Sequence, residues 1–336
     1  MARLAQACHT GAMVTSPRDP LRVFDRRAVR LHRARAARLP DAADFLINES
    51  AERLVDRLDD VTRRFPLALD LGCRDGVMAR VLKGRGGVAT LVQADAALAY
   101  VQRLPMGVPR LVAEAEALPF RGQSFDLVLS NLDLHWTNDL PGALLQLRHM
   151  LKPDGLLLAA LLGGETLAEL SRALIEAELA EEGGIGPRVS PSADIRDIGM
   201  LLQRAGFALP VVDSDTVAVT YPDALALMRD LRAMGETNAA SERRRGFTRR
   251  ATLARAAAIY GERFGTGDGR VRASFEIITL TAWAPHESQP QPLKPGSAST
   301  RLADALGAVE RPAGGNSDAG TGFRLDKSGK APGRFR

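Results

Sequence analysis

The chain has 336 residues, enough for one large or two small domains, and 45% of them are hydrophobic, which suffices for a sizeable core. Its two cysteines, Cys8 and Cys73, have no CxxC neighbour, so the sequence indicates neither a disulfide framework nor a zinc site. The net charge of +5 includes arginine clusters, but no aromatic residues alternate with them, which argues against a nucleic-acid partner. No hydrophobic run is long enough for a transmembrane segment.

The N-terminal part of the chain divides into two regions. Residues 1–22 show no periodicity and are expected to be flexible, and their composition does not fit a secretory signal peptide. Residues 23–38 and 43–58 have hydrophobic residues at helical spacing, so we expect residues 23–65 to form N-terminal helices. Pro66 ends this region, because proline interrupts regular structure.

A regular alternation of strands and helices follows Pro66. We predict strands at 67–71, 90–95, 109–113, 124–130 and 155–161, and helices at 77–83, 96–104 and 140–151. Strands that alternate with helices at this spacing indicate a parallel sheet with right-handed crossover connections. The expected class is therefore α/β, with helices on both faces of the sheet.

The second half of the chain is predicted to contribute helices and two further strands. Helices are expected at 166–182, 192–205, 222–234 and 251–263, with Ser190 or Ser192 as an N-cap, strands at 208–220 and 271–283, and a loop with a short helix at 235–250. We expect residues 66–286 to form one domain, in which residues 164–205 and 222–264 make a helical cap. Residues 287–336 have the composition of a disordered basic tail.

The stretch Leu67-Ala-Leu-Asp-Leu-Gly-Cys-Arg-Asp-Gly76 predicts a cofactor-binding turn. A buried strand leads into a glycine turn that opens a helix, and glycine allows positive φ and close approach to a ligand. The sequence has neither a P-loop nor the Gly-x-Gly-x-x-Gly fingerprint, which argues against ATP, GTP and NAD. A cofactor that carries no phosphate, such as S-adenosylmethionine, fits a turn of this kind.

Acidic residues end the next two strands at the same edge of the predicted sheet. Asp95 is placed to accept hydrogen bonds from two ribose hydroxyls, although a helix N-cap is the alternative role for this side chain. Residues 114–120 offer backbone and an acid to an adenine, and the alternative there is a solvated acidic loop. The candidate cofactor residues are Asp70, Gly72, Cys73, Gly76, Asp95, Ala96, Glu114, Ala115, Glu116 and Asn131.

The fourth predicted strand ends in Asn131-Leu-Asp-Leu-His-Trp136, where a substrate would meet the cofactor. His135 and Trp136 are candidates for the substrate pocket, because histidine is a natural base near neutral pH. In the alternative, His135 is a hydrogen-bonded structural side chain and Trp136 belongs to the core. The catalytic residue is not identified, and no motif proposes a metal.

These motifs resemble those of the class I S-adenosylmethionine-dependent methyltransferases. Asp70 to Gly76 is similar to the first motif of that fold, Gln93-Ala-Asp95 to the second, and residues 114–120 and 125–131 to the third and fourth. The resemblance implies a Rossmann-like, mostly parallel seven-stranded sheet with S-adenosyl-L-methionine as cofactor. Arg74 stands where the family has a third glycine, so its side chain is expected to point out of the pocket.

A closer resemblance extends over residues 24–297. Segments outside the general motifs, among them Leu134-His-Trp136, Gly163-Gly-Glu-Thr-Leu167 and Met234-Gly-Glu-Thr-Asn238, are similar to a family of assembly factors of mitochondrial respiratory complex I described as arginine hydroxylases. The chain looks like a bacterial counterpart. A more distant similarity connects it to the malonyl-acyl-carrier-protein methyltransferases of biotin synthesis.

The closer resemblance implies a protein substrate, an iron–sulfur subunit of complex I, hydroxylated on an arginine. Glu165, Glu169 and Glu236 are candidates to meet the substrate guanidinium. Two alternatives stay open: an O-methyltransferase, for which Arg229 and Arg232 would face the pocket, and an assembly chaperone without catalysis. The expected location is the bacterial cytoplasm, with peripheral association at the inner face of the membrane left open.

Overall fold

The computed structural model describes residues 22–39, 44–290, 300 and 304. The predicted flexible segment at 1–22 and the predicted tail at 287–336 lie almost entirely outside these residues. The chain divides into two compact units, residues 1–287 and 288–336, and the fold below is that of the first.

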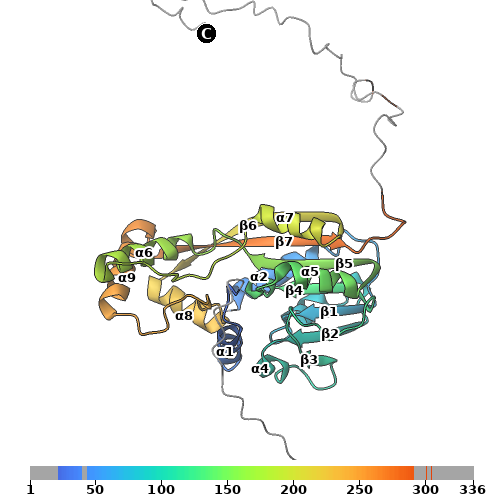
Figure 1. The fold of residues 1–336 in the computed structure, drawn as a ribbon, viewed down its shortest axis with the longest axis horizontal. Coiled ribbons are helices and arrows are strands. Elements are labelled where there is room, and N and C mark those ends of the chain that lie inside the picture. Colours follow the sequence, from blue (N-terminus) through green and yellow to red (C-terminus); the bar gives the residue numbers. More distant parts are fainter. Residues whose placement is uncertain (1–21, 40–43, 291–299, 301–303, 305–336) are drawn as a thin grey trace, which may run out of the picture. The chain divides into compact units, whose positions relative to one another are not determined.

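A seven-stranded sheet organises the first unit, with strand order β3-β2-β1-β4-β5-β7-β6 (Figure 1). Strands β1 to β5 pair in parallel, whereas β7 is antiparallel to both β5 and β6. The predicted mostly parallel seven-stranded sheet is therefore confirmed. The strands are β1 (Leu67–Leu71), β2 (Thr90–Asp95), β3 (Arg110–Val112), β4 (Phe125–Asn131), β5 (Leu151–Leu162), β6 (Ala208–Tyr221) and β7 (Val271–Trp283).

Helices cover both faces of the sheet, because the central strands are hydrophobic on both sides. Every residue of β4 is buried, as expected for a strand between two layers of helices. One hydrophobic core includes Leu54 and Met78 from α2 (Phe45–Asp56) and α3 (Val77–Leu82). A second core includes Leu147 and Ile198 from α5 (Leu140–Met150) and α7 (Ile195–Arg204). The predicted α/β Rossmann-like arrangement is thus present.

The remaining helices pack mainly on one another and on the first core. Helix α6 (Ala168–Glu182) lies along α9 (Arg250–Phe264), and α1 (Arg26–Ala36) lies beside α8 (Ala224–Met234) (Figure 1). Helix α7 instead packs on α5 and the sheet. The division of the domain into a core and a helical cap remains a proposal.

Three local expectations were wrong. The helix predicted at 96–104 is only α4 (Leu98–Val101), because Asp95 accepts a hydrogen bond from Ala97 N and holds Ala97 in an extended conformation. The N-cap of α7 is Asp194, which accepts from Arg196 N, and not one of the two serines. Residues 235–249 contain no helix, and the two short 3-10 turns lie at η1 (Arg85–Gly87) and η2 (Leu134–Trp136).

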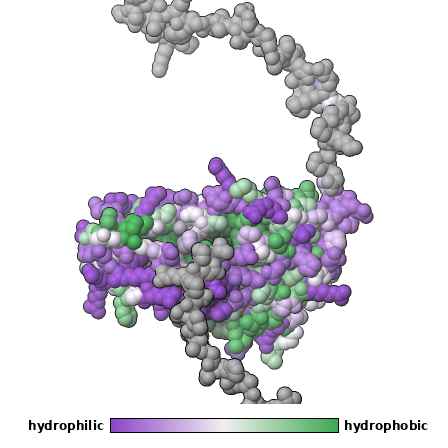
Figure 2. All heavy atoms as spheres, in the orientation of Figure 1, coloured by the Kyte–Doolittle hydropathy of each residue, from purple (hydrophilic) through white to green (hydrophobic). Residues whose placement is uncertain are grey.

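Charged and polar side chains dominate the face seen in Figure 2. Hydrophobic residues gather on that face over α6 and around β3 and α4, and the exposed hydrophobic side chains include Ile175, Leu179, Met106 and Leu98. Within the described residues, every helix is too short or too polar to cross a membrane.

Candidate cofactor and substrate site

The turn after β1 has the backbone geometry that the glycines predict. Gly72 and Gly76 have φ of 77° and 86°, in the left-handed region that favours glycine. The N–H groups of Gly72 and Cys73 both donate to Ala94 O, at 2.8 and 3.0 Å, and this fixes the turn against the end of β2. Gly76 is the N-cap of α3, and at Gly72 and Gly76 the turn has only backbone to present to the edge of the sheet.

Asp70 is a buried carboxyl with spare hydrogen-bonding capacity. Gln93 Nε2 lies 3.5 Å from Asp70 Oδ2, which is a weak contact, and Asp70 Oδ1 has no partner among the described residues. Burial raises the pKa of Asp70 to about 8, and the neighbouring Asp95 and Asp133 act in the same direction. A cationic ligand group placed here would favour the ionised form of this carboxyl and give its unpartnered oxygen a hydrogen bond.

Asp95 lies at the end of β2, fully buried, and its carboxylate is already paired. Arg33 of α1 donates to it through Nη2 at 2.5 Å and Nε at 3.4 Å. Arg33 also forms an ion pair with Asp133, Nη1 to Oδ1, at 2.7 Å, and its guanidinium lies 5.7 Å from the centre of the Tyr100 ring. Burial disfavours the charge of Arg33, but the two carboxylates outweigh it and raise the pKa of Arg33.

The expectation that Arg74 points out of the pocket was wrong. Its side chain is 2% exposed and donates to Met234 O and to Glu236 Oε1, both at 2.6 Å. Its φ of 51° is the left-handed conformation that a glycine would take without strain. The buried acceptors at the end of α8 explain how an arginine occupies this place in the turn, since a long side chain can reach them.

Glu236 connects this arginine to the predicted substrate residues. It accepts hydrogen bonds from His135 Nε2 at 3.0 Å and from Trp136 Nε1 at 3.1 Å, in addition to Arg74. Burial acts to raise its pKa, but His135 and Arg74 lower the pKa of Glu236 to about 2. The structure therefore brings His135 and Trp136 together around an ionised carboxylate, while His135 Nδ1 is buried and has no partner among the described residues.

The acidic segment after β3 is tied to α1 and to the loop after η2. Glu114 accepts from Arg26 Nη2 at 3.2 Å and from Arg30 Nη1, and these arginines lower its pKa although burial opposes them. Glu116 accepts from Asn138 N, and Ala115 is buried. Both acids are thus paired within the chain, and the alternative of a freely solvated acidic loop does not describe them.

The other predicted cofactor residues are brought to the same edge of the sheet. Asn131 donates to Ile47 O at 2.9 Å, and its Oδ1 is buried without a partner among the described residues. Cys73 is buried, and burial raises the pKa of its thiol, which keeps it in the unreactive form. Ala96 is half-buried beside Asp95.

The two other acids predicted to meet a substrate guanidinium have different surroundings. Glu169 accepts from Ser274 Oγ at 2.6 Å, and the N–H of Glu165 donates to Glu276 at 2.9 Å. Neither contact involves the residues after β1 and β4, so among the three acids only Glu236 is placed at the candidate site. No group of three or more His, Cys, Asp or Glu side chains in the described part of the chain is arranged to hold a metal ion.

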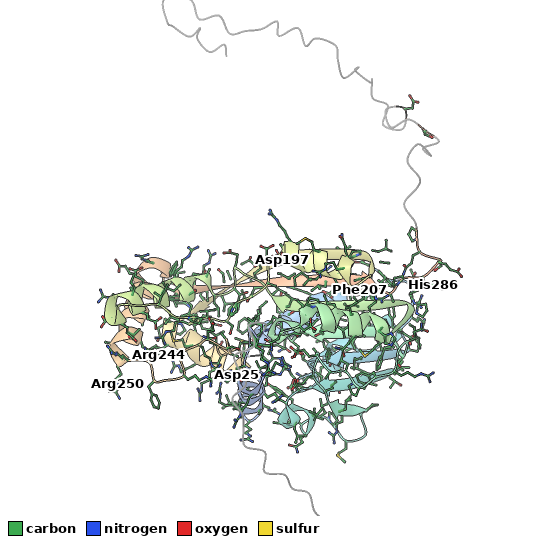
Figure 3. All side chains as sticks on the ribbon, in the orientation of Figure 1. Asp25, Asp197, Phe207, Arg244, Arg250 and His286 are labelled. Carbon is green, nitrogen blue, oxygen red and sulfur yellow. The ribbon has the colours of Figure 1, made fainter. Side chains whose placement is uncertain are left out.

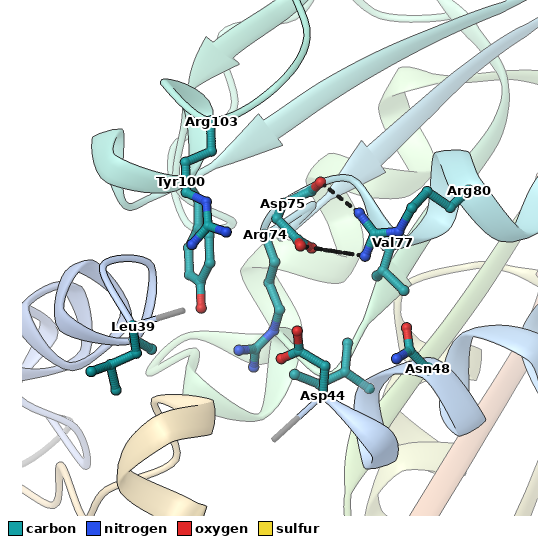
Figure 4. A pocket seen from close by; sticks show the side chains of 11 residues that line it. Leu39, Asp44, Asn48, Arg74, Asp75, Val77, Arg80, Tyr100 and Arg103 are labelled. Atoms are coloured by element: carbon teal, nitrogen blue, oxygen red, sulfur yellow. Dashed lines mark hydrogen bonds and ion pairs between the residues drawn. The ribbon is translucent and has the colours of Figure 1, made fainter. Parts of the chain in front are cut away.

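A cavity of about 200 Å³ lies beside the glycine turn (Figure 4). Ligand pockets for molecules of drug size measure roughly 300–1,000 Å³, so this cavity is small for a whole nucleoside cofactor. Figure 4 shows Arg74 and Tyr100 on its wall, with Asp75 paired to Arg80. The other lining residues are Ala36, Leu39, Asp44, Ile47, Asn48, Val77 and Arg103.

The residues at this edge of the sheet have the chemistry to bind S-adenosyl-L-methionine, but other side chains of the protein occupy much of the space that the cofactor would fill. The unpaired Asp70 oxygen suits an ammonium group, and the positive-φ turn suits close backbone approach. However, a Cβ built on Gly72 would lie 2.3 Å from Asp133 Cβ, so Asp133 fills the cradle of the turn. The guanidinium of Arg33 likewise occupies the space beside the carboxylate of Asp95. Binding of the cofactor at Gly72 and Asp95 would require these two side chains to move.

Sequence reasoning did not identify Arg33, Asp133 or Tyr100. A signal for Arg33 was present, because it lies at helical spacing from Val29 and Ala36 and so falls on the buried side of α1. Asp133 stands between the predicted Asn131 and His135, but its role depends on how the loop after β4 approaches the glycine turn. Only the folded chain shows that contact.

The fold is that of the class I S-adenosyl-L-methionine-dependent methyltransferases, with a glycine turn after β1 in a mostly parallel seven-stranded sheet. A family profile described as "Methyltransferase domain" matches residues 69–159, the part of the chain that contains the glycine turn, Asp95 and β4. This match supports S-adenosyl-L-methionine as the cofactor and an enzyme of methyltransferase-like type. The YcgJ protein of Bacillus subtilis is a solved structure similar to this chain, with a TM-score of 0.49, 14% identity and coverage of 69% of this chain and 98% of that one.

Comparison with curated relatives identifies the family within this class. The protein named "Arginine-hydroxylase NDUFAF5, mitochondrial" from Danio rerio is 45% identical over 294 residues, which cover 86% of this chain and 91% of the relative. The "Malonyl-[acyl-carrier protein] O-methyltransferase" of Methylovorus sp. (strain MP688) is 38% identical over 276 residues, which cover 78% of this chain and 90% of the relative. The chain belongs to the family of the arginine-hydroxylase NDUFAF5 proteins.

Proposed function

We propose that the chain is an S-adenosyl-L-methionine-binding enzyme that hydroxylates an arginine in an iron–sulfur subunit of respiratory complex I during assembly of the complex. The reaction converts a C–H bond to C–OH, so it also needs an oxygen-atom donor as co-substrate, namely molecular oxygen with a two-electron reductant, and the second oxygen atom leaves as water. The family membership supports the reaction and the kind of substrate. The structural observation that carries the proposal is the charge of the site. It favours a cationic substrate side chain over an anionic one.

Acidic side chains outnumber arginines where the cofactor and substrate would meet. The acids paired with the buried arginines Arg33 and Arg74 are Asp95, Glu236 and the partly exposed Asp133. Asp70 is a further buried acid, whose raised pKa of about 8 favours its protonated form at neutral pH until a cation is bound beside it. Both arginines show that the site accommodates guanidinium groups, through charge-assisted hydrogen bonds to carboxylates. A malonyl carboxylate would meet the same acids and be repelled by them.

We further propose how the chain holds the cofactor. Asp70, Gly72 and Gly76 would bind the methionine end, Asp95 the ribose hydroxyls and residues 114–116 the adenine, with Cys73, Ala96 and Asn131 lining the pocket. When bound, S-adenosyl-L-methionine supplies a sulfonium centre, whose positive charge suits a pocket with spare acid. The role of the chain is to orient this cation and to exclude water from it, since most of the residues concerned are buried.

His135 is the residue we propose to orient the substrate. Because a carboxylate only accepts hydrogen bonds, the contact of Glu236 with His135 Nε2 places a proton on that nitrogen. In the tautomer protonated at Nε2 alone, His135 Nδ1 carries a lone pair, and this atom is buried without a partner among the described residues. An N–H of a substrate guanidinium would satisfy this lone pair, with Trp136 held beside it by the same carboxylate.

The O-methyltransferase alternative has its support in the 38% identical malonyl-acyl-carrier-protein relative. It requires cations at the substrate pocket, for which Arg229 and Arg232 on α8 are the candidates. Both residues are exposed in the structure and take no part in the buried network around Glu236. The surroundings of the pocket therefore favour an arginine over a carboxylate as substrate.

Mass spectrometry of the complex I iron–sulfur subunit distinguishes these functions. The subunit would be purified from a deletion strain, from the same strain complemented with the natural chain, and from one complemented with Asp95→Ala. Loss of one oxygen from an arginine in the deletion and mutant strains is expected. In acyl-carrier protein purified from the same strains, a methyl group missing from the malonyl thioester would support the O-methyltransferase instead. Unchanged masses with failed assembly of the complex would support a chaperone.

Calorimetric titration with S-adenosyl-L-methionine tests the cofactor assignment separately. The natural chain is expected to bind, and Asp95→Ala is expected to lose binding. A circular dichroism spectrum of the mutant serves as the folding control, because Arg33 would lose a buried partner. Retained affinity in a folded Asp95→Ala protein would contradict the proposed role of Asp95 in holding the ribose.

A further inference from the structure

Arg33 occupies every acceptor position of the Asp95 carboxylate that backbone N–H groups do not already use. A carboxylate offers about four acceptor positions. The backbone N–H groups of Arg74 and Ala97 take two of them, at 3.0 and 2.8 Å, and Arg33 takes the other two through Nη2 and Nε. The two backbone donors belong to the turn and to the start of α4, so they cannot leave without unfolding these elements. The Arg33 side chain is the removable partner.

A ribose at Asp95 and the guanidinium of Arg33 are therefore mutually exclusive. Two hydroxyl donors would need the positions that the Arg33 nitrogens occupy. The Arg33 side chain is 1% exposed and pairs with Asp133 as well, so it fills the volume beside the carboxylate and not only its lone pairs. Its distance of 5.7 Å from the Tyr100 ring centre shows that an aromatic face closes this position from another side.

We propose that Arg33 is an internal competitor of the cofactor, which sets the affinity for S-adenosyl-L-methionine and makes cofactor binding precede substrate binding. In the closed arrangement, Arg33 neutralises Asp95 and Asp133 and occupies the site. The incoming cofactor brings positive charge and two hydroxyl donors to the same acids and displaces the guanidinium. The inference rests on the proposed S-adenosyl-L-methionine site, and it adds a residue of α1 that controls access to it.

The contacts of α1 explain why displacement of Arg33 would reach the substrate side. His32 Nδ1 lies 3.0 Å from Thr237 O, and Arg35 donates to Thr237 Oγ1 at 3.1 Å. Asp25 N donates to Ala239 O at 2.8 Å. The segment held in this way, residues 237–239, directly follows Glu236. A shift of α1 would therefore move the carboxylate that positions His135 and Trp136.

The start of α1 is fixed to the same part of the chain. Asp25 caps α1 by accepting from Ala28 N, and it pairs with Arg243 at 3.0 Å. Figure 3 labels Asp25, together with Arg244 from the segment that connects α8 to α9 and Arg250 at the start of α9. Because α1 is held to residues 237–243 at its start and to Thr237 in its last turns, a shift of α1 on loss of the Arg33 contacts would carry this segment with it.

Calorimetric titration of the full chain with S-adenosyl-L-methionine tests the proposal, with Arg33→Met as the variant and Arg27→Met as the matched control. Arg27 lies on the exposed side of the same helix, so its loss removes one charge without touching the site. Arg33→Met is expected to bind more tightly, by a factor within the roughly 5- to 150-fold range typical of coupling between sites. Its melting temperature without cofactor is expected to fall, because Asp95 and Asp133 lose their partner.

Arg33→Lys keeps the proposal testable if Arg33→Met does not fold. Lysine retains the charge but makes only a point contact, so a smaller gain in affinity is expected in a stable protein. Unchanged or weaker binding in the folded variants, with binding by the natural chain, would overturn the competitor role alone. Absence of binding in the natural chain and in all variants would overturn both the competitor role of Arg33 and the assignment of S-adenosyl-L-methionine as cofactor. Binding by the variants only would support the proposal.

Discussion

The side chain of Asp133 occupies the space in which a side chain at position 72 would lie. The two positions are so close that a Cβ on Gly72 would be 2.3 Å from Asp133 Cβ. The contact joins the turn after β1 to the loop after β4, and it places Asp133 where it can pair with Arg33. Gly72 is thus required both by its own backbone conformation and by the packing of a second loop.

Gly72→Ala is expected to destabilise the protein and to abolish cofactor binding. A non-glycine residue in the left-handed region costs about 1–2 kcal/mol, and the overlap with Asp133 adds to it. Gly84→Ala is the control, since Gly84 has a φ of 84° but no atom lies within 4 Å of the position that its Cβ would take. Urea denaturation of both variants measures the difference. An equal loss of stability in the two would mean that Asp133 moves away without cost.

Asp70 is expected to make the protein less stable as pH rises from about 4 to 8. Its pKa in the folded chain is about 8, against 3.8 for the ordinary side chain, so over this range the folded state binds a proton that the unfolded state has released. The slope from one such proton is about 1.4 kcal/mol per pH unit at most. Asp70→Asn, which resembles the neutral form, should flatten this dependence. Urea denaturation at several pH values measures it, and identical slopes for both proteins would contradict the prediction.

Glu236→Gln is expected to destabilise the protein at neutral pH. Removing one partner of a buried ion pair typically costs about 3–5 kcal/mol, and here Arg74 would be left without its carboxylate. The pKa of Glu236 is lowered to about 2 from 4.5, so its contribution is present above pH 4.5 and is lost as pH falls toward 2. Thermal denaturation, compared with that of the exposed-site control Glu242→Gln, measures this effect, and equal melting temperatures would refute it.

The same variant should change the surroundings of Trp136. The indole Nε1 loses an ionised acceptor, and His135 loses the partner that determines its tautomer. A shift of tryptophan fluorescence is expected in Glu236→Gln but not in Glu242→Gln. An unaltered spectrum would show that the glutamine amide oxygen replaces the carboxylate at the indole.

Cys73 is expected to react with thiol reagents only when the chain unfolds. The side chain is buried, and burial raises the pKa of the thiol, so little thiolate is present at neutral pH. Labelling of a Cys8→Ser protein by iodoacetamide, with and without urea, measures the accessibility of Cys73 alone. Rapid labelling of the folded protein would show that the glycine turn opens readily in solution.

The sequence by itself determined the order of strands and helices, because the hydrophobic pattern and the glycine and proline positions are local properties. β1, β2 and β7 begin and end at the predicted residues, and the acids at the ends of β1 and β2 lie at one edge of the sheet as expected. The exceptions are also local. The helix after Asp95 is shorter than predicted because the side chain of Asp95 holds the start of that segment extended.

Only the tertiary structure decided which charges meet. Arg33 and Asp95 are 62 residues apart in the chain, and Arg74 and Glu236 are 162 residues apart, so no local pattern relates them. Their pairing follows from burial: a charge removed from water needs a partner, and the fold determines which opposite charge is within reach. For the same reason, the sequence could nominate Asp95 as a ribose ligand, whereas only the folded chain shows that Arg33 already holds it.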